Sequence, residues 1–197
     1  MTEVKWPYLT PGIPDAMFRR EEGIPLTKEE IRILTMAKAR LKPGQTVYDI
    51  GSGTGSLTVE AARLVSPGQV YAIEKEPAAA ALTKANAHRF ALNNVELAAG
   101  AAPAVLAGLP EADRVLVGGS CGRLTAILEE CLHKLKPEGR IVINAITWET
   151  LLGGMDFARA HGLEPEVISI NVARLTAAGH SQLWKSLNAI YIITLQV

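Results

Sequence analysis

The sequence has no excess of charge of either sign, and this balance limits the partners that the protein can have. Its 197 residues carry 20 Lys and Arg side chains against 20 Asp and Glu, and no run of Lys or Arg is longer than a pair. Nucleic acids and anionic membranes usually attract proteins that present a concentrated positive field. We therefore predict that neither nucleic acid nor a membrane surface is a partner.

Cysteine is also scarce, and the two cysteines do not form the pattern of a metal site. Cys121 and Cys131 are ten residues apart, form no Cys-x-x-Cys pair and have no histidine at metal-ligand spacing. Disulfides are rare in reducing compartments, where isolated cysteines stay as free thiols. We expect two reduced thiols without a catalytic role, and no bound metal.

Long apolar runs are missing too. Nowhere are there eighteen consecutive apolar residues, roughly the length that a membrane-spanning helix needs. Residues 1–7 also lack the apolar core of a signal peptide. These absences predict a cytoplasmic protein. What the sequence does have is 48% hydrophobic residues, enough for the core of one domain with at most a small appendage.

From about residue 27 onward, β-branched runs alternate with Ala- and Leu-rich stretches, which predicts an α/β fold with a mostly parallel sheet covered on both faces. The expected helices are 28–40, 55–64, 77–92, 124–135 and 148–161. The expected strands are 46–50, 69–74, 95–98, 114–118 and 140–145. Two more apolar runs, 166–175 and 186–195, flank a polar turn at 176–181 and predict an antiparallel pair at the end of the sheet. Seven strands result.

The first 26 residues are richer in proline and glycine than the rest of the chain. We interpret residues 1–26 as an N-terminal arm on the substrate side, followed by one domain over residues 27–197.

The most informative stretch is Asp49-Ile50-Gly51-Ser52-Gly53-Thr54-Gly55, between the first expected strand and the next helix. A glycine-rich turn at this point of an α/β sheet predicts a nucleotide-like ligand. Glycines at alternate positions leave the turn without Cβ atoms there, so the backbone can bend sharply and a ligand can lie against it.

The spacing of the glycines distinguishes between ligands. A dinucleotide fingerprint would place its third glycine at position 56, where this chain has Ser56. The pattern Asp-x-Gly-x-Gly-x-Gly instead resembles the first motif of class I S-adenosylmethionine-dependent methyltransferases. The resemblance implies that the loop lies along the methionine part of this cofactor, and that Asp49 orients the loop or meets the cofactor's ammonium group through water. A dinucleotide site and a merely structural turn are the alternatives.

Two further positions fit an adenosyl group. Glu74 ends the second expected strand, nineteen residues beyond Gly55, where a carboxylate can accept hydrogen bonds from both ribose hydroxyls. An acid there also suits NAD, so Glu74 does not discriminate between the two cofactors. After the third strand, Gly100-Ala101-Ala102 forms a small-residue corner whose backbone N–H groups can face adenine; a plain loop is the alternative.

The loop after the fourth expected strand reads Gly118-Gly119-Ser120-Cys121-Gly122. It lacks the Asn or Asp followed by Pro-Pro-Tyr with which many methyltransferases align a planar nitrogen. This absence argues against methylation of a base and favours a bulky substrate that needs close approach to the backbone.

Segments along nearly the whole chain together resemble the decarboxylating precorrin C-15 methyltransferases of cobalamin biosynthesis. They are 11–15 with Phe18, 27–32, 49–55, 70–74, 100–103, 118–120, 139–142 and 171–174. The resemblance implies a class I, Rossmann-like methyltransferase that uses S-adenosylmethionine, methylates C-15 of a cobalt-precorrin and decarboxylates its C-12 acetate side chain. It also implies a homotetramer. Departures from the family pattern are Cys121 in place of Gly, Ala101 in place of Asp and Ala189 in place of Pro.

The resemblance also adds site residues to those of the motif. The predicted cofactor-binding set is Thr27, Asp49, Gly51, Ser52, Gly53, Thr54, Gly55, Glu74, Gly100, Ala101 and Ala102. Thr27 also forms, with Glu30, the Thr-x-x-Glu pattern of a helix capping box. The predicted substrate-binding set is Gly119, Ser120, Arg123 and Arg174, because arginine binds carboxylates in bidentate fashion.

The catalytic residue is not identified, and Asp15 and His180 are the candidates for proton transfer. The alternative function is another class I methyltransferase, acting on a small molecule or on protein as the isoaspartyl enzymes do. That alternative does not account for the arm segment 11–18.

Overall fold

The computed structural model describes residues 4–197, so residues 1–3 of the predicted arm lie outside the described part of the chain. The helices are α1 Glu29–Ala39, α2 Ser56–Val65, α3 Pro77–Arg89, α4 Leu124–Lys134 and α5 Trp148–Ala160, with short 3-10 turns at Asp15–Met17 and Ala104–Gly108. The strands are β1 Thr46–Ile50, β2 Gln69–Glu74, β3 Val95–Ala99, β4 Ala112–Val117, β5 Leu135–Ala145, β6 Glu166–Ile170, β7 Ala173–Ala178, β8 Ser181–Ser186 and β9 Ile190–Gln196. No helix within residues 4–197 is long and apolar enough to cross a membrane.

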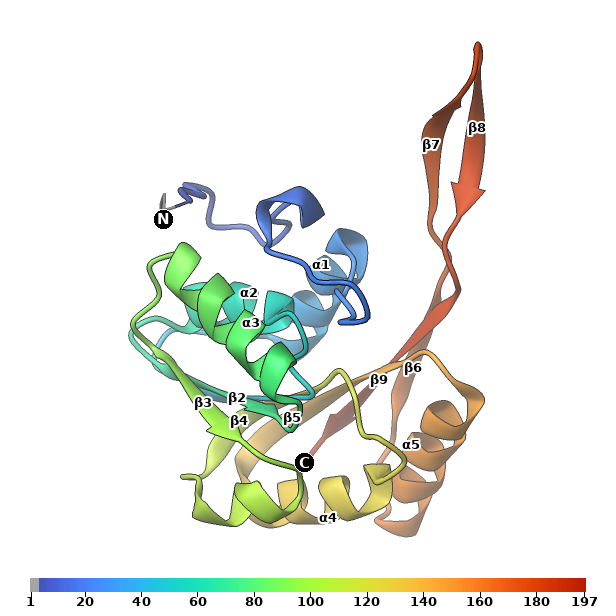
Figure 1. The fold of residues 1–197 in the computed structure, drawn as a ribbon. Coiled ribbons are helices and arrows are strands. Elements are labelled where there is room, and N and C mark those ends of the chain that lie inside the picture. The colour runs from blue at the N-terminus through green and yellow to red at the C-terminus, as the bar shows by residue number, and fades with distance from the viewer. Residues whose placement is uncertain (1–3) are drawn as a thin grey trace.

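Seven strands form one twisted sheet in the order β3-β2-β1-β4-β5-β9-β6 (Figure 1). The pairs among β1 to β5 are parallel, whereas β9 runs antiparallel to both β5 and β6. The predicted α/β fold, with a mostly parallel seven-stranded sheet and an antiparallel C-terminal pair, is confirmed. Because β1 lies between β2 and β4, the connections after β1 and β4 diverge at this switch point and leave a crevice at the carboxyl ends of the strands.

Helices cover both faces of the sheet, with α1, α2 and α3 on one side and α4 and α5 on the other (Figure 1). Neighbouring residues of β1 therefore point into different cores. Val47 packs in a buried cluster with Met36 of α1, and Tyr48 packs in another with Leu128 of α4 and Phe157 of α5. A strand that is buried on both faces has no alternating polar positions, which is why the parallel strands read as nearly continuous apolar runs.

The connection between the last two sheet strands differs from the prediction. The segment predicted as a polar turn at 176–181 instead contains the ends of β7 and β8, which pair as a hairpin with Gly179 and His180 at its tip. The hairpin stands away from the body of the molecule (Figure 1). Likewise, β5 begins at Leu135 instead of residue 140. The short turn prediction was wrong because small and polar residues dominate β7, so the sequence shows no apolar alternation there.

The predicted capping box does not form. Helix α1 begins at Glu29 with Lys28 as its N-cap residue, and no side chain caps it. The carboxylate of Glu30 is bound by Arg174 instead. A charged, bidentate partner is stronger than a backbone N–H group, which explains why Glu30 does not turn back to the helix end.

The described part of the arm packs against the layer of α1 to α3. Ile13 and Phe18 are buried in a cluster with Val59 of α2 and Phe90, and the rings of Phe18 and Phe90 have their centroids 5.2 Å apart. The carbonyl oxygen of Pro25 would lie 3.1 Å from a Cβ placed on Gly53, so the end of the arm lies against the glycine-rich loop.

Candidate functional site

A cavity of about 300 Å³ lies at the carboxyl ends of β1 to β4. Loops after all four strands contribute to its lining, as expected at the switch point of an α/β sheet. Predicted site residues that line it are Gly51, Gly53, Glu74, Gly100, Ala101, Ala102, Gly119, Ser120 and Arg123. The topology therefore brings most of the predicted residues together.

The other residues of the glycine-rich loop, Ser52, Thr54 and Gly55, do not line this cavity. The hydroxyl oxygens of Ser52 and Thr83 lie 2.9 Å apart, so Ser52 faces helix α3. Gly55 has φ +75°, and a Cβ there would lie 2.9 Å from Thr83 Cα. Thr54 is buried, and its carbonyl accepts a hydrogen bond from Asn86. These residues connect the loop to α3, and a direct cofactor contact for them remains a prediction.

The loops that follow β1 and β4 touch each other at Gly51. Its φ is +73°, and a Cβ there would lie 2.6 Å from the carbonyl oxygen of Gly119. Such a distance is far inside van der Waals contact, so the loops after β1 and β4 can touch only because position 51 has no side chain.

Asp49 lies beneath the loop and is completely buried. Its Oδ2 accepts a hydrogen bond from the Thr58 hydroxyl, while its Oδ1 has no partner among the described residues. Burial raises the pKa of this carboxyl group to about 6. An unpaired buried carboxylate oxygen is costly, so we interpret Oδ1 as an acceptor held for a ligand.

The carboxylate of Glu74 is held in a fixed direction by backbone groups. Its Oε2 accepts from the N–H of Gly53 at 2.9 Å, and its Oε1 accepts from the N–H groups of Lys75 at 2.9 Å and Glu76 at 3.0 Å. Three of roughly four acceptor positions are thereby occupied. The remaining position, on Oε2, suits a hydroxyl of a ligand in the cavity.

A second cavity, of about 500 Å³, shares residues 118–121 with the first. The N-terminal ends of α4 and α5 both border it, through Leu124 and Thr125 and through Thr147 and Thr150. Helix N-termini favour negative charge because of their free N–H groups and the helix dipole. The helix ends give this wall of the cavity positive potential, and the Glu149 carboxylate also lies in the lining.

Sequence reasoning missed the residues of this second cavity that lie at the carboxyl end of β5 and just after it. They are Asn144 within β5, followed by Ile146, Thr147, Glu149, Thr150 and Gly153. The available signal was their position at the carboxyl end of a central strand, which is where α/β sheets bind ligands.

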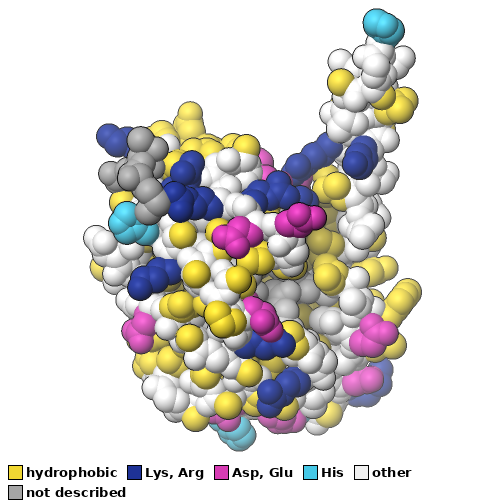
Figure 2. Space-filling view, viewed as in Figure 1, with side chains coloured by type: hydrophobic (Ala, Val, Ile, Leu, Met, Phe, Trp, Pro, Cys, Tyr) yellow, Lys and Arg dark blue, Asp and Glu magenta, His cyan; other side chains and the backbone are white. Residues whose placement is uncertain are grey.

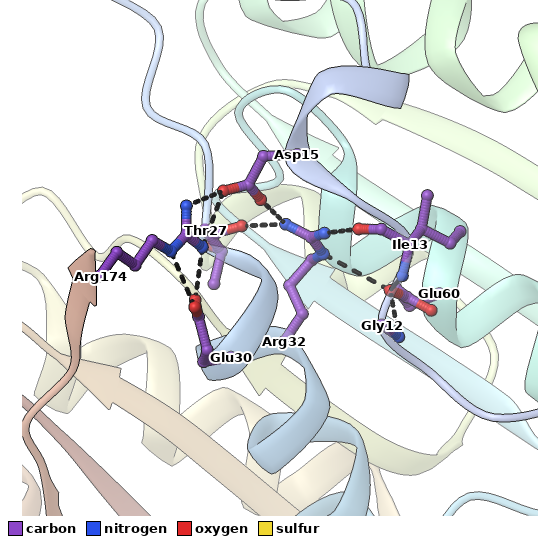
Figure 3. A network of polar contacts seen from close by, with 8 residues as sticks. All are labelled: Gly12, Ile13, Asp15, Thr27, Glu30, Arg32, Glu60 and Arg174. Carbon is purple, nitrogen blue, oxygen red and sulfur yellow. Dashed lines mark hydrogen bonds and ion pairs between the residues drawn. The ribbon is translucent and has the colours of Figure 1, made fainter. Parts of the chain in front are cut away.

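Outside the stretch Asp49 to Gly55, four predicted residues line neither cavity: Asp15, Thr27, Arg174 and His180. Asp15 and Arg174 form an ion pair with an N–O distance of 3.3 Å, and Arg174 also binds Glu30 at 2.6 Å (Figure 3). His180 lies at the tip of the β7–β8 hairpin. Thr27 is also absent from the lining, although its neighbour Pro25 belongs to it. The roles predicted for these residues remain predictions.

The fold and the position of the glycine-rich loop define the class of the protein as a class I S-adenosylmethionine-dependent methyltransferase. An S-adenosylmethionine-dependent O-methyltransferase from Thermotoga maritima has the same fold, with a TM-score of 0.71 at 17% identity over 87% of this chain and 66% of that one.

Within this class, the chain belongs to the family described by the precorrin methyltransferase domain, whose model matches residues 16–196. A Pyrobaculum calidifontis protein named probable cobalt-precorrin-6B C(15)-methyltransferase (decarboxylating) is 44% identical over 96% of this chain and 97% of its own length. The structure of a precorrin-6y C5,15-methyltransferase from Geobacter metallireducens has a TM-score of 0.91 at 36% identity, over 98% of this chain and 100% of that one. This membership favours the precorrin interpretation over an isoaspartyl-type methyltransferase.

Proposed function

We propose that this protein binds S-adenosylmethionine, methylates C-15 of a cobalt-precorrin and decarboxylates its C-12 acetate side chain. One observation carries the proposal: two adjacent cavities share the loop of residues 118–121. A cofactor in the first cavity and a substrate in the second would meet at this loop. The names of the relatives support the choice of substrate.

Residues in and beside the first cavity offer polar groups that match those of S-adenosylmethionine. In our proposal, the free acceptor position of Glu74 binds a ribose hydroxyl, and the unpaired oxygen of Asp49 faces the ammonium group, directly or through water. The corner Gly100-Ala101-Ala102 borders the adenine. Because Ala101 has no polar side chain, backbone groups or water would make the contacts to the adenine edge. S-adenosylmethionine, when bound, supplies an electrophilic methyl group.

The second cavity fits an apolar macrocycle that carries carboxylates. Ser120 and the N-terminal ends of α4 and α5 border it and offer hydrogen-bond donors and positive potential. Arg123, which lines the first cavity, is the N-cap residue of α4 and would bind a substrate carboxylate from that side. Beside them, Ile146 and Trp148 have exposed apolar side chains, which would cover one face of the ring.

In the proposed reactions, the main task of the protein is to orient the substrate and the cofactor. Holding the nucleophilic carbon in line at near-contact distance lowers the barrier to methyl transfer without a covalent intermediate on the protein. In decarboxylation, the bond between the side-chain methylene and the carboxyl carbon breaks, and carbon dioxide leaves. The electron pair enters the conjugated ring, and a proton then completes the new methyl group. Asp15 and His180 remain the candidates for delivering this proton, although neither lines a cavity.

We propose further that the protein is a cytoplasmic homotetramer, with the β7–β8 hairpin in its subunit interfaces. Leu183 and Trp184 of the hairpin are 58% and 72% exposed, and the hairpin stands clear of the body with hydrophobic side chains on view (Figure 2). An isolated two-stranded hairpin is marginally stable in water. Neighbouring copies of this chain would cover the apolar side chains and stabilise it.

Calorimetric titration with S-adenosylhomocysteine and, separately, with NAD tests the cofactor half of the proposal. We expect S-adenosylhomocysteine to bind at one site per chain and NAD not to bind. A chain that bound NAD and failed to bind S-adenosylhomocysteine would overturn the proposal.

A further inference from the structure

Five charged side chains from four separate parts of the chain form one network (Figure 3). Asp15 comes from the arm, Glu30 and Arg32 from α1, Glu60 from α2 and Arg174 from the start of β7. The network therefore joins the hairpin to the arm across helix α1.

Arg32 holds the arm from the inside. Its side chain is fully buried, and its Nη1 lies 2.7 Å from Asp15 Oδ1. The carbonyl groups of Ile13 and Thr27 accept hydrogen bonds from the same guanidinium group, which also lies 4.7 Å from the ring centroid of Phe18. Because Arg32 binds residues at both ends of the segment 15–27, it closes this segment into a loop at its base.

Glu60 fixes the backbone of the arm to α2. Its Oε1 accepts hydrogen bonds from the N–H groups of Gly12 at 3.0 Å and Ile13 at 2.9 Å, and it lies 3.5 Å from Arg32 Nε. Buried charges without such partners are costly, so Arg32 and Glu60 depend on each other and on the arm.

Arg174 holds the same segment from the outside. Its Nε and Nη2 donate to the two carboxylate oxygens of Glu30 at 2.8 and 2.6 Å, a bidentate pair, and the guanidinium lies 3.3 Å from Asp15 Oδ2. The hydrogen bonds from Arg174 lower the pKa of the Glu30 carboxyl group. The Arg174 side chain is 39% exposed, which makes it the outer and more easily opened part of the network.

The segment that these residues hold reaches the first cavity. Pro25 lines that cavity, and its carbonyl oxygen would lie 3.1 Å from a Cβ placed on Gly53. The segment 15–27 therefore forms part of the cavity wall and touches the glycine-rich loop, while its other end touches Arg174 through Asp15.

We infer that Arg174 and Asp15 are positioning residues through which the β7–β8 hairpin holds the arm segment 15–27 against the cofactor cavity. This inference rests on the proposed cofactor and adds the device that keeps its cavity closed. It also means that whatever orders the hairpin, such as a neighbouring copy of the chain, favours cofactor binding.

The test compares Arg174→Ala with Arg174→Lys and with the control Lys185→Ala. Lys185 pairs with Arg174 across the hairpin and is exposed, so its loss changes the hairpin charge equally without touching the network. Glu30→Gln weakens the same ion pair from the α1 side and leaves the hairpin sequence intact. Thermal unfolding identifies the temperature at which all the variants are folded.

Two readouts are measured under those conditions: the affinity for S-adenosylhomocysteine, and the rate at which trypsin cleaves the arm after Arg19 or Arg20. For Arg174→Ala and Glu30→Gln we expect affinity to fall about five- to tenfold and arm cleavage to accelerate by a similar factor, which is a typical size for coupling between two sites. Arg174→Lys should lie between Arg174→Ala and the wild type. Lys185→Ala should match the wild type.

Wild-type affinity and arm cleavage in both Arg174→Ala and Glu30→Gln would overturn the inference, and so would an equal loss in Lys185→Ala. Failure of the wild-type protein itself to bind S-adenosylhomocysteine would overturn the proposed cofactor. The arm-cleavage readout would still report whether Arg174 holds the arm, so the two failures are distinguishable.

Discussion

At the residue scale, the role proposed for Asp49 in cofactor binding has a cost in stability. It is completely buried, and one of its carboxylate oxygens has no partner among the described residues. Burial raises its pKa to about 6, which means that the folded protein binds a proton there more tightly than the unfolded chain does. The stabilisation from this proton is complete below the ordinary pKa of an aspartate and is lost as the pH rises through about 6.

Asp49→Asn should therefore make the protein more stable at neutral pH and weaken cofactor binding. The neutral amide avoids the cost of a buried charge, but it cannot attract the cofactor's ammonium group. The measurements are the thermal midpoint of unfolding and the affinity for S-adenosylhomocysteine at neutral pH. A variant that was less stable and bound equally well would contradict this interpretation of Asp49.

The wild-type protein should also lose affinity for S-adenosylhomocysteine in acid. Asp49 becomes protonated as the pH falls through about 6, so the affinity should drop about tenfold between pH 7 and pH 5. In Asp49→Asn the affinity should be weak and nearly independent of pH over this range. Parallel titrations of the two proteins across that range measure the difference.

Gly51→Ala should separate the loops after β1 and β4. The new Cβ would lie 2.6 Å from the carbonyl oxygen of Gly119, so we expect a loss of about 2–3 kcal/mol in the free energy of unfolding and a loss of S-adenosylhomocysteine binding. Gly44→Ala is the control, because Gly44 also has a positive φ but has nothing within 4 Å of its Cβ position. It should lose only about 1–2 kcal/mol. Equal losses in the two variants would show that the close approach of the loops is unimportant.

Individual site residues could be predicted from the sequence where they belong to a motif at the end of a particular strand. The glycine loop and Glu74 could be found because the chemistry of a strand end is local. The contacts of Arg174 could not be found, since Asp15 and Glu30 precede it by 159 and 144 residues. Only the folded chain brings them together, and it gives Arg174 two acidic partners within the protein.

At the scale of elements, the hairpin of β7 and β8 is the part that most needs a partner. Leu175 and Trp184 lie opposite each other on one face, while Leu183 points to the other face. All three side chains are exposed. A surface that is apolar on both faces is a poor match for water, which supports its place between subunits.

Replacement of Leu183 and Trp184 by serine should therefore dissociate the proposed tetramer while each chain stays folded. The sheet is unaffected because neither side chain packs in a core cluster. Light scattering measures the mass, with Gln182→Ser as the control from the same strand. A monomeric wild-type protein would contradict the proposed assembly, and a serine variant that remained tetrameric would exclude the hairpin from its interfaces.

The elements of the sheet could be predicted because each strand and helix carries its own pattern of apolar residues. The β7–β8 hairpin was not predicted because it lacks such a pattern. Its first strand, Ala173–Ala178, consists largely of small and polar residues, and the body of the protein supplies no apolar surface for it to match. The start of β5 was missed because Lys136-Pro137-Glu138-Gly139 resembles a turn, although these residues lie within the strand.

At the scale of the whole molecule, the sheet order places two cavities on either side of one loop. The strand order β2-β1-β4-β5 brings the ends of β1 and β4 together, so residues 118–121 belong to both cavities. A methyl donor and its acceptor need such a shared boundary, because transfer requires near contact of the reacting atoms.

The most direct test is to incubate the protein with cobalt-precorrin-6B and S-adenosylmethionine labelled in its methyl group, and to analyse the tetrapyrrole by mass spectrometry. We predict a product that has gained one labelled methyl group at C-15 and has lost one carboxyl group as carbon dioxide. Recovery of the unchanged tetrapyrrole, from protein shown to bind S-adenosylhomocysteine, would contradict the proposed function.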